Sequence, residues 1–145
     1  MPQKIPSERK AEMDAVLAQA VNASLATANP ATLQPHVVPV WFWWDGERIW
    51  ISAFSSTRKV KELLLNRRCA VLVEPLPGTS TLRGVLLEGA AELLAEDRAE
   101  VARLSEIIYA RYMPPEELAG PEPQSWMVDP ENTIVCLEPE RLVGF

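Results

Sequence analysis

Residues that bind metals or form disulfide bonds are scarce in this sequence. Its 145 residues include two cysteines, Cys69 and Cys136, and one histidine, His36. Two cysteines far apart in the chain indicate neither a metal-binding framework nor a dense disulfide scaffold. We therefore predict no metal site, and we expect both cysteines to be buried free thiols in a reducing compartment.

Long hydrophobic runs are absent as well. The longest strongly apolar stretch, Val37 to Trp44, is too short to cross a bilayer as a helix. The N-terminal sequence MPQKIPSERK lacks the apolar core of a signal peptide. Together these absences predict a cytoplasmic protein that does not enter a membrane.

Positive charge is in the minority. The chain carries 14 Lys and Arg against 20 Asp and Glu, which gives a formal net charge of −6. A general affinity for nucleic acid or anionic membranes needs a broad positive potential, and this charge balance argues against both partners. The length and the hydrophobic content of 48% suit one domain, residues 1–145, with its own core.

Recognisable catalytic motifs are missing too. The sequence contains no nucleophile elbow, no glycine-rich phosphate loop and no His/Cys set with metal spacing. His36 follows Pro35 at the start of a predicted strand, where partial exposure is a better expectation than an acid–base role. The catalytic residues therefore stay unassigned.

Hydrophobic periodicity predicts many short strands and few helices. Strands are predicted at residues 23–28, 36–44, 47–54, 69–74, 82–94, 133–138 and 141–145. Helices are predicted at residues 7–20, 57–66 and 97–112, and the proline-rich segment 113–124 has room for one helical turn. The strand 36–44 is apolar on both faces, which predicts cover on both sides, and Asp45-Gly46 predicts a tight hairpin after it. This pattern favours a small antiparallel β-barrel with helices that plug or flank it.

The helix predicted at residues 57–66 begins with an unfavourable set of charges. Arg58, Lys59 and Lys61 lie in its first turns, where cations oppose the helix dipole at a cost of about 0.3–1 kcal/mol each. If Ser56 is the N-cap, Lys59 occupies the position where a capping box has Glu or Gln. A bound phosphate at the helix start explains this arrangement, because backbone N–H groups, hydroxyls and cations would converge on it. The alternative is that the long basic side chains only extend into water.

Pro39 lies inside the otherwise well-formed strand 36–44 and removes one backbone hydrogen-bond donor from it. An edge strand facing solvent would tolerate this proline. The hydrophobicity of the strand favours a covered surface instead. A flat heterocycle lying against the strand would account for both features.

At these residues the sequence resembles a known family. The segments ASLATA, PHVVPVWFWWDGERIWISAFSSTRKVKELLLNRRCAVLVE and LRGVLLEGAAELL, between Ala23 and Leu94, are similar to the pyridoxamine 5′-phosphate oxidase-like split-barrel flavoproteins, and IIYARY and LEPERLVGF continue the likeness weakly. The resemblance implies a mainly β fold with flanking helices, a six-stranded antiparallel split barrel of Greek-key type. It also implies a homodimer with a flavin or deazaflavin at the interface, and an FMN-dependent oxidoreductase acting on a small unidentified substrate.

The resemblance also implies a set of cofactor-binding residues. The phosphate would lie near Thr57, Arg58 and Lys59, with Lys61 as an auxiliary contact. The ring would lie along two strands, around 38–41 and 52–53. Arg83, beside Gly84, stands where these enzymes have a cofactor-contacting Gln. The complete set is Val38, Pro39, Val40, Trp41, Ser52, Ala53, Ser56, Thr57, Arg58, Lys59, Lys61 and Arg83.

Departures from the family pattern leave alternatives open. True pyridoxamine phosphate oxidases carry basic residues on the strand that matches HVVPVWF, and this chain has none there. Relatives that use the deazaflavin coenzyme F-420 have similarly apolar second strands, so the cofactor is FMN or F-420. A non-catalytic cofactor carrier, sensor or haem-binding relative is the alternative of a different class. Trp126 either covers the cofactor ring or packs against the barrel, and for Tyr109 and Tyr112 core or dimer contacts are favoured.

Overall fold

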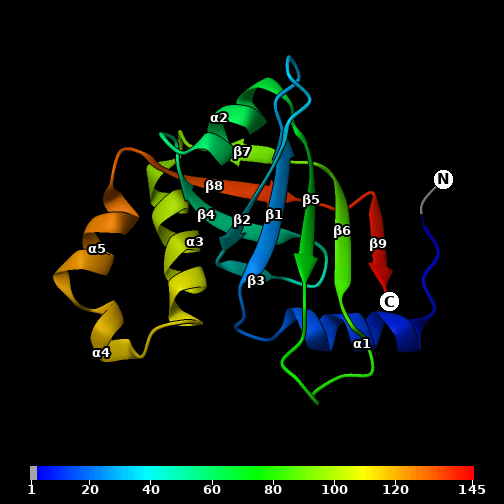
Figure 1. Ribbon diagram of the computed structural model, residues 1–145. Coiled ribbons are helices and arrows are strands. Elements are labelled where there is room, and N and C mark those ends of the chain that lie inside the picture. The colour runs from blue at the N-terminus through cyan, green and yellow to red at the C-terminus, as the bar shows by residue number, and fades with distance from the viewer. Residues whose placement is uncertain (1–2) are drawn as a thin grey trace.

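The computed structural model describes residues 3–145 and consists of two antiparallel sheets with helices around them (Figure 1). The five-stranded sheet has the order β2-β1-β5-β6-β9, and the four-stranded sheet has the order β3-β4-β8-β7. The strands are β1 (Ala23–Ala28), β2 (Pro35–Val40), β3 (Phe42–Trp44), β4 (Ile49–Phe54), β5 (Arg68–Val73), β6 (Val85–Ala90), β7 (Glu92–Leu94), β8 (Asn132–Leu137) and β9 (Arg141–Gly144).

Two of the predicted strands pass from one sheet to the other. The strand predicted at 36–44 is divided at Trp41 into β2 and β3, and the strand predicted at 82–94 is divided at Ala91 into β6 and β7. With β2/β3 and β6/β7 each counted as one strand, β1, β4, β5 and β8 complete the six strands of the split barrel, and β9 adds an edge. The predicted fold class is confirmed. The second break falls two residues after Gly89.

The core lies between the inner faces of the two sheets. The register places Leu25, Val71, Leu87 and Leu142 in one row across four neighbouring strands, and all four side chains are buried. Alternation in each strand produces this row, because successive side chains of a strand point to opposite faces. The hairpin between β3 and β4 forms at Asp45-Gly46 as predicted, and Gly46 takes a positive φ of 102° there.

The helices close the ends and one side of the barrel. Helix α1 (Ser7–Leu17) lies across one end and α2 (Arg58–Leu65) across the other, while α3 (Arg98–Ala110), α4 (Pro115–Leu118) and α5 (Pro121–Val128) stand beside the four-stranded sheet (Figure 1). Both α4 and α5 begin with a proline in the first turn, a position that lacks a backbone partner in any helix. The proline-rich segment therefore holds more helix than the single turn expected.

The expectation that strand 36–44 is covered on both faces does not hold within one chain. Strand β2 is the edge of its sheet, and Pro35, Val37 and Pro39 are exposed on its outer face. Pro39 is tolerated at this position because an edge strand has no neighbour to receive its missing N–H bond. The outer face of β2 thus remains apolar and open.

Two further expectations concern cysteines and membrane helices. Cys69 and Cys136 are free thiols, but only Cys136 is buried as expected, whereas Cys69 is partly exposed. Burial nevertheless raises the pKa of each to about 11. The longest described helix, α3, has 13 residues. No helix within residues 3–145 combines the length and apolarity needed to cross a membrane.

Candidate cofactor site

A cavity of about 430 Å³ opens where the break between β2 and β3 meets β4, the start of α2, α3 and α5. We call it the aromatic pocket. It is lined by Asn22, Pro39, Val40, Trp41, Ser52, Phe54, Lys59, Tyr109 and Trp126. Its volume falls within the range of small-molecule sites, and an apolar lining with a few polar groups is typical of them.

Aromatic side chains pack against one another along the pocket. The Tyr109 ring meets Trp41 edge to face, with 6.0 Å between ring centroids, and meets Trp126 in the same way at 6.1 Å. Tyr112 stacks on Trp41 with nearly parallel planes and 4.7 Å between ring centroids. These contacts are favourable geometries for aromatic pairs, so the wall of the pocket is preformed.

Hydrogen bonds to the backbone at the break between β2 and β3 fix the orientation of Trp41. The backbone N–H of Phe42 donates to the Tyr112 hydroxyl at 3.1 Å, and that hydroxyl donates to the Val21 carbonyl at 2.8 Å. The Arg111 guanidinium donates to the carbonyls of Phe42 and Gln19. The C-terminal end of α3 therefore supplies the backbone partners that the strand loses at Trp41, and the Trp41 ring faces the pocket.

Polar groups form the floor of the pocket. The Ser52 hydroxyl lies 3.1 Å from the Tyr109 hydroxyl and donates to Oδ1 of Asn132, also at 3.1 Å. Asn132 is fully buried, and its amide nitrogen donates to Ser105 Oγ and to the Met127 carbonyl. Burial raises the pKa of Tyr109, so its hydroxyl is neutral at physiological pH.

Lys59 is the cation of the aromatic pocket. Its ammonium forms no ion pair and no hydrogen bond with any residue in 3–145, and burial lowers the pKa of the amine. A partly buried charge without a partner is unfavourable, and an anion entering the pocket would relieve it. Within residues 3–145, the Lys59 charge thus has no compensating group.

The start of α2 leaves backbone donors without partners. Thr57 is the N-cap, one residue later than Ser56, and its hydroxyl donates back to the Phe54 carbonyl at 2.6 Å instead of capping the helix. No acidic residue lies in the first turn. Within residues 3–145 the N–H groups of Arg58, Lys59 and Val60 donate no hydrogen bond. The charge conflict predicted from the sequence is therefore present, together with the free N–H groups that an anion would use.

Arg58 and Lys61 point away from the aromatic pocket. They line a second, open cavity of about 740 Å³, the turn-side cavity, together with Asn29, Thr32, Gln34, Ser56, Glu62 and Leu65. Arg58 Nε donates to the carboxylate of Glu62 at 3.0 Å, and the Thr27 hydroxyl donates to it at 2.7 Å. Glu62 is only 4% exposed. The hydrogen bond from Thr27 and the pairing with Arg58 lower the pKa of this carboxyl.

The structure therefore brings some of the predicted cofactor residues together and separates others. Five of them line the aromatic pocket: Pro39, Val40, Trp41, Ser52 and Lys59. Val38 packs against the core beside them, and Ala53 is 4% exposed within the core, so its side chain is not available. Arg83 lies beside the C-terminus, where its N–H donates to the Phe145 carbonyl at 2.6 Å, and it lines neither cavity.

Sequence reasoning missed several residues of the pocket. Phe54 and Asn22 line it, and Tyr109, for which a core or dimer contact was favoured, forms one wall. Trp126 lines the pocket and packs edge to face against Tyr109 of α3. Asn132 carried no sequence signal, because an asparagine before a strand is usually a turn residue.

Comparisons with known proteins agree with this fold. The family model described as Pyridoxamine 5′-phosphate oxidase matches residues 10–143. A search of curated proteins finds no match. A conserved hypothetical protein from Mycobacterium tuberculosis is 28% identical, with a TM-score of 0.76 over 97% of this chain and 85% of its own.

Two other solved structures share the fold at lower identity. An F-420 reductase is 19% identical, with a TM-score of 0.73 over 96% of this chain and 98% of its own. A putative pyridoxamine 5′-phosphate oxidase from Listeria innocua is 20% identical, with a TM-score of 0.68 over 94% and 97%. The family match spans nearly the whole chain and includes every strand of the barrel, and the chain therefore belongs to the pyridoxamine 5′-phosphate oxidase family.

Proposed function

We propose that this chain is an FMN-dependent oxidoreductase that acts on a small substrate and binds its cofactor in the aromatic pocket. The observation that carries the proposal is the unpaired, partly buried Lys59 beside a preformed aromatic wall. A phosphorylated ring compound has the two features that such a site recognises, a flat π-system and an anionic group. When bound, the flavin supplies the hydride transfer, which suits a chain without a catalytic motif.

The residues present fit such a cofactor. Trp41, Tyr109 and Trp126 offer ring faces and edges, and Ser52 with Tyr109 offers hydroxyl groups for a polar ring edge. Lys59 and the free N–H groups at the start of α2 would hold the phosphate from one side. Lys61 borders the same helix start from the turn-side cavity and would add to the positive potential there. Ser56 would add a hydroxyl donor, while Arg58 stays paired with Glu62.

A deazaflavin cofactor is the second candidate. Strand β2 carries no Lys or Arg, which departs from the strict FMN pattern of pyridoxamine phosphate oxidases. A solved F-420 reductase shares the fold, although its 19% identity supports the fold alone. Both cofactors carry a planar tricyclic ring and a phosphate, so the aromatic pocket suits either one.

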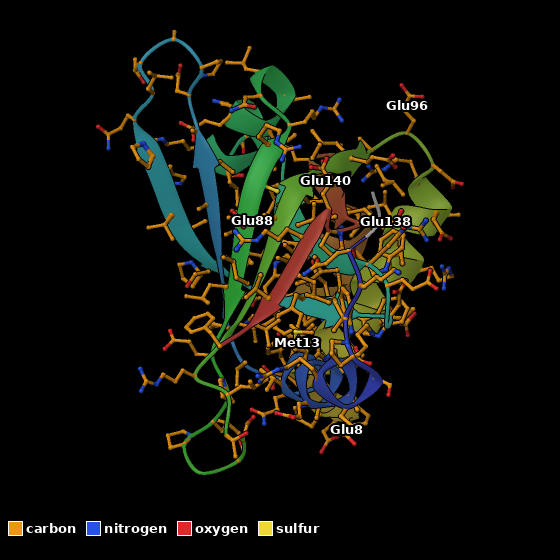
Figure 2. The ribbon with its side chains drawn as sticks, turned by 90° about the vertical axis from the view of Figure 1, so that its right-hand side faces the viewer. Glu8, Met13, Glu88, Glu96, Glu138 and Glu140 are labelled. Carbon is orange, nitrogen blue, oxygen red and sulfur yellow. The ribbon has the colours of Figure 1, made fainter. Side chains whose placement is uncertain are left out.

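We also propose that the chain forms a homodimer through the outer face of its five-stranded sheet. The register places Pro39, Ser24, Leu72, Leu86 and Val143 in one row across all five strands of that face. Glu88 and Glu140, labelled in Figure 2, mark its charged end, where they pair with Arg141 and Arg68. Apart from Ser24 this row is apolar, and a surface of this kind is typical of a protein interface.

The aromatic pocket borders this proposed interface. Pro39 belongs both to the outer face and to the lining of the pocket. A second copy seated on the face would therefore lie beside a bound cofactor.

Spectroscopy and titration of the purified chain test the proposal. We expect a flavin or deazaflavin spectrum, or binding of FMN or F-420 by the colourless protein with one cofactor per chain, and a dimer in sedimentation. A haem spectrum, or an absence of binding of both cofactors, would contradict the proposed function. A monomer that binds FMN would contradict the proposed dimer and leave the pocket assignment in place.

A further inference from the structure

The direction of hydrogen bonding at the floor of the aromatic pocket is set by Asn132. Its side-chain nitrogen lies 3.3 Å from the Met127 carbonyl oxygen, an atom that can only accept a hydrogen bond. The NH₂ group must therefore face Met127 and Ser105, and Oδ1 must face Ser52. Because Asn132 is fully buried, this orientation is fixed by the protein and not by solvent.

The position of Oδ1 determines where the Ser52 proton goes. Within residues 3–145, the Ser52 hydroxyl is the one donor that reaches Oδ1 of Asn132. If Ser52 turned its proton elsewhere, a buried amide oxygen would lose its partner, which costs more than an ordinary hydrogen bond contributes. A serine hydroxyl has a single proton, so Ser52 can only accept from Tyr109.

The Tyr109 hydroxyl then donates to Ser52 across their 3.1 Å contact. Burial raises the pKa of Tyr109, so the proton needed for this bond is retained. The hydroxyl protons of Ser52 and Tyr109 are therefore both used in hydrogen bonds within the protein. What they present to the cavity is oxygen lone pairs.

We propose that Asn132 acts through Ser52 to make the floor of the aromatic pocket a hydrogen-bond acceptor, which selects a heterocyclic ring whose buried edge carries an N–H group. Asn132 is thus a positioning residue, while Ser52 and Tyr109 contact the ligand. This inference rests on the proposed function and adds that the edge of the ring with the N–H group is the one that faces the floor. A ring edge with acceptors alone would face lone pairs and bind less well.

A pair of fragments with one shape tests this polarity without reference to the cofactor. Indole carries an N–H where benzofuran carries a ring oxygen, so the two differ chiefly in the hydrogen-bonding atom. We expect the wild-type chain to bind indole about fivefold more tightly than benzofuran in a ligand-observed NMR titration, the worth of one neutral hydrogen bond. In Ser52→Ala the Tyr109 hydroxyl loses its acceptor and is free to donate into the cavity, so this preference should fall to about onefold. Tyr109→Phe leaves the Ser52 proton on Asn132 and should therefore keep part of the preference.

Ser125→Ala is the matched control, because this exposed hydroxyl on α5 donates to the Glu122 carbonyl and does not line the pocket. It should keep the indole preference. A residue with only a structural role would change the affinity of both fragments alike. Equal or tighter binding of benzofuran by the wild type, binding of neither fragment, or an unchanged preference in Ser52→Ala would overturn the proposal. Failure to bind FMN with the indole preference intact would instead contradict only the proposed function.

Discussion

Arg58 and Lys59 are neighbours in the sequence with different surroundings in the structure. Successive helical residues point about 100° apart, since a turn contains 3.6 residues. Lys59 therefore enters the aromatic pocket without a partner, whereas Arg58 points to the turn-side cavity and pairs with the buried carboxylate of Glu62. Cations that are neighbours in the sequence therefore do not form one cluster in space. Lys59, which has no internal partner, is the better candidate of the two for binding an anionic ligand.

The largest expected effect is on phosphate recognition. Lys59→Met should weaken FMN binding about 10–100-fold, because one charge-assisted hydrogen bond is lost at a cost of about 1.5–3 kcal/mol. Riboflavin, which has the same ring without the phosphate, should bind the variant within about twofold of the wild type. Lys61→Met, which removes a cation from the turn-side cavity, should weaken FMN binding less. Fluorescence titration with both ligands measures this, and an equal loss for FMN and riboflavin would contradict the assignment of Lys59.

A smaller effect should appear in the pH dependence of binding. Burial lowers the pKa of Lys59 in the free protein, and a bound phosphate would raise it in the complex. The FMN affinity should therefore be full below the pKa of the free protein and should fall as the pH rises through it, starting below the ordinary value of 10.5. The ratio of FMN to riboflavin affinity removes the titration of the ring itself. In Lys59→Met this ratio should not change over the same pH window.

The smallest expected effect is on the stability of the cofactor-free protein, where the two cations should act in opposite directions. Lys59→Met removes a cation from the positive end of α2 and should raise the unfolding midpoint by about 1–4 °C. Arg58→Met leaves the Glu62 carboxylate with Thr27 as its remaining partner and should lower the midpoint.

The pairing of Arg58 has its own pH signature. Because the pKa of Glu62 is lowered in the folded protein, its stabilising contribution is present above the unfolded value of 4.5 and is lost as the pH falls through the folded value. The difference between wild type and Arg58→Met should therefore shrink in acid. If calorimetry at neutral pH shows the unfolding midpoints of Lys59→Met and Arg58→Met shifting in the same direction, the proposed difference between the two cations is wrong.

Much of the fold was predictable because its signals are local. The strand at 23–28, the Asp45-Gly46 turn and the helix that begins at Ser7 each depend on residues that are close together in the sequence, and the structure confirms all three. The break at Trp41 was not predictable, since its partners are Tyr112 and Arg111, about 70 residues further along the chain. The unbroken apolar pattern around Trp41 gives no local reason for the strand to stop.

The site was predictable only in part, because contacts between residues far apart in the sequence also decide its arrangement. The family resemblance placed Trp41, Ser52 and Lys59 together, because they belong to neighbouring elements of the barrel. It did not separate Arg58 from Lys59, since that depends on the buried Glu62 and its bond to Thr27. The polarity of the floor rests on Asn132, whose amide is oriented by contacts with α3 and α5.

A structure of the chain crystallised with saturating FMN, and in parallel with F-420, would examine the pocket assignment itself. We expect the cofactor ring against Trp41 and Trp126 and the phosphate within hydrogen-bonding distance of Lys59 Nζ. A ring bound elsewhere on the barrel, or a phosphate held by Arg58 and Lys61 alone with Lys59 still unpaired, would contradict it.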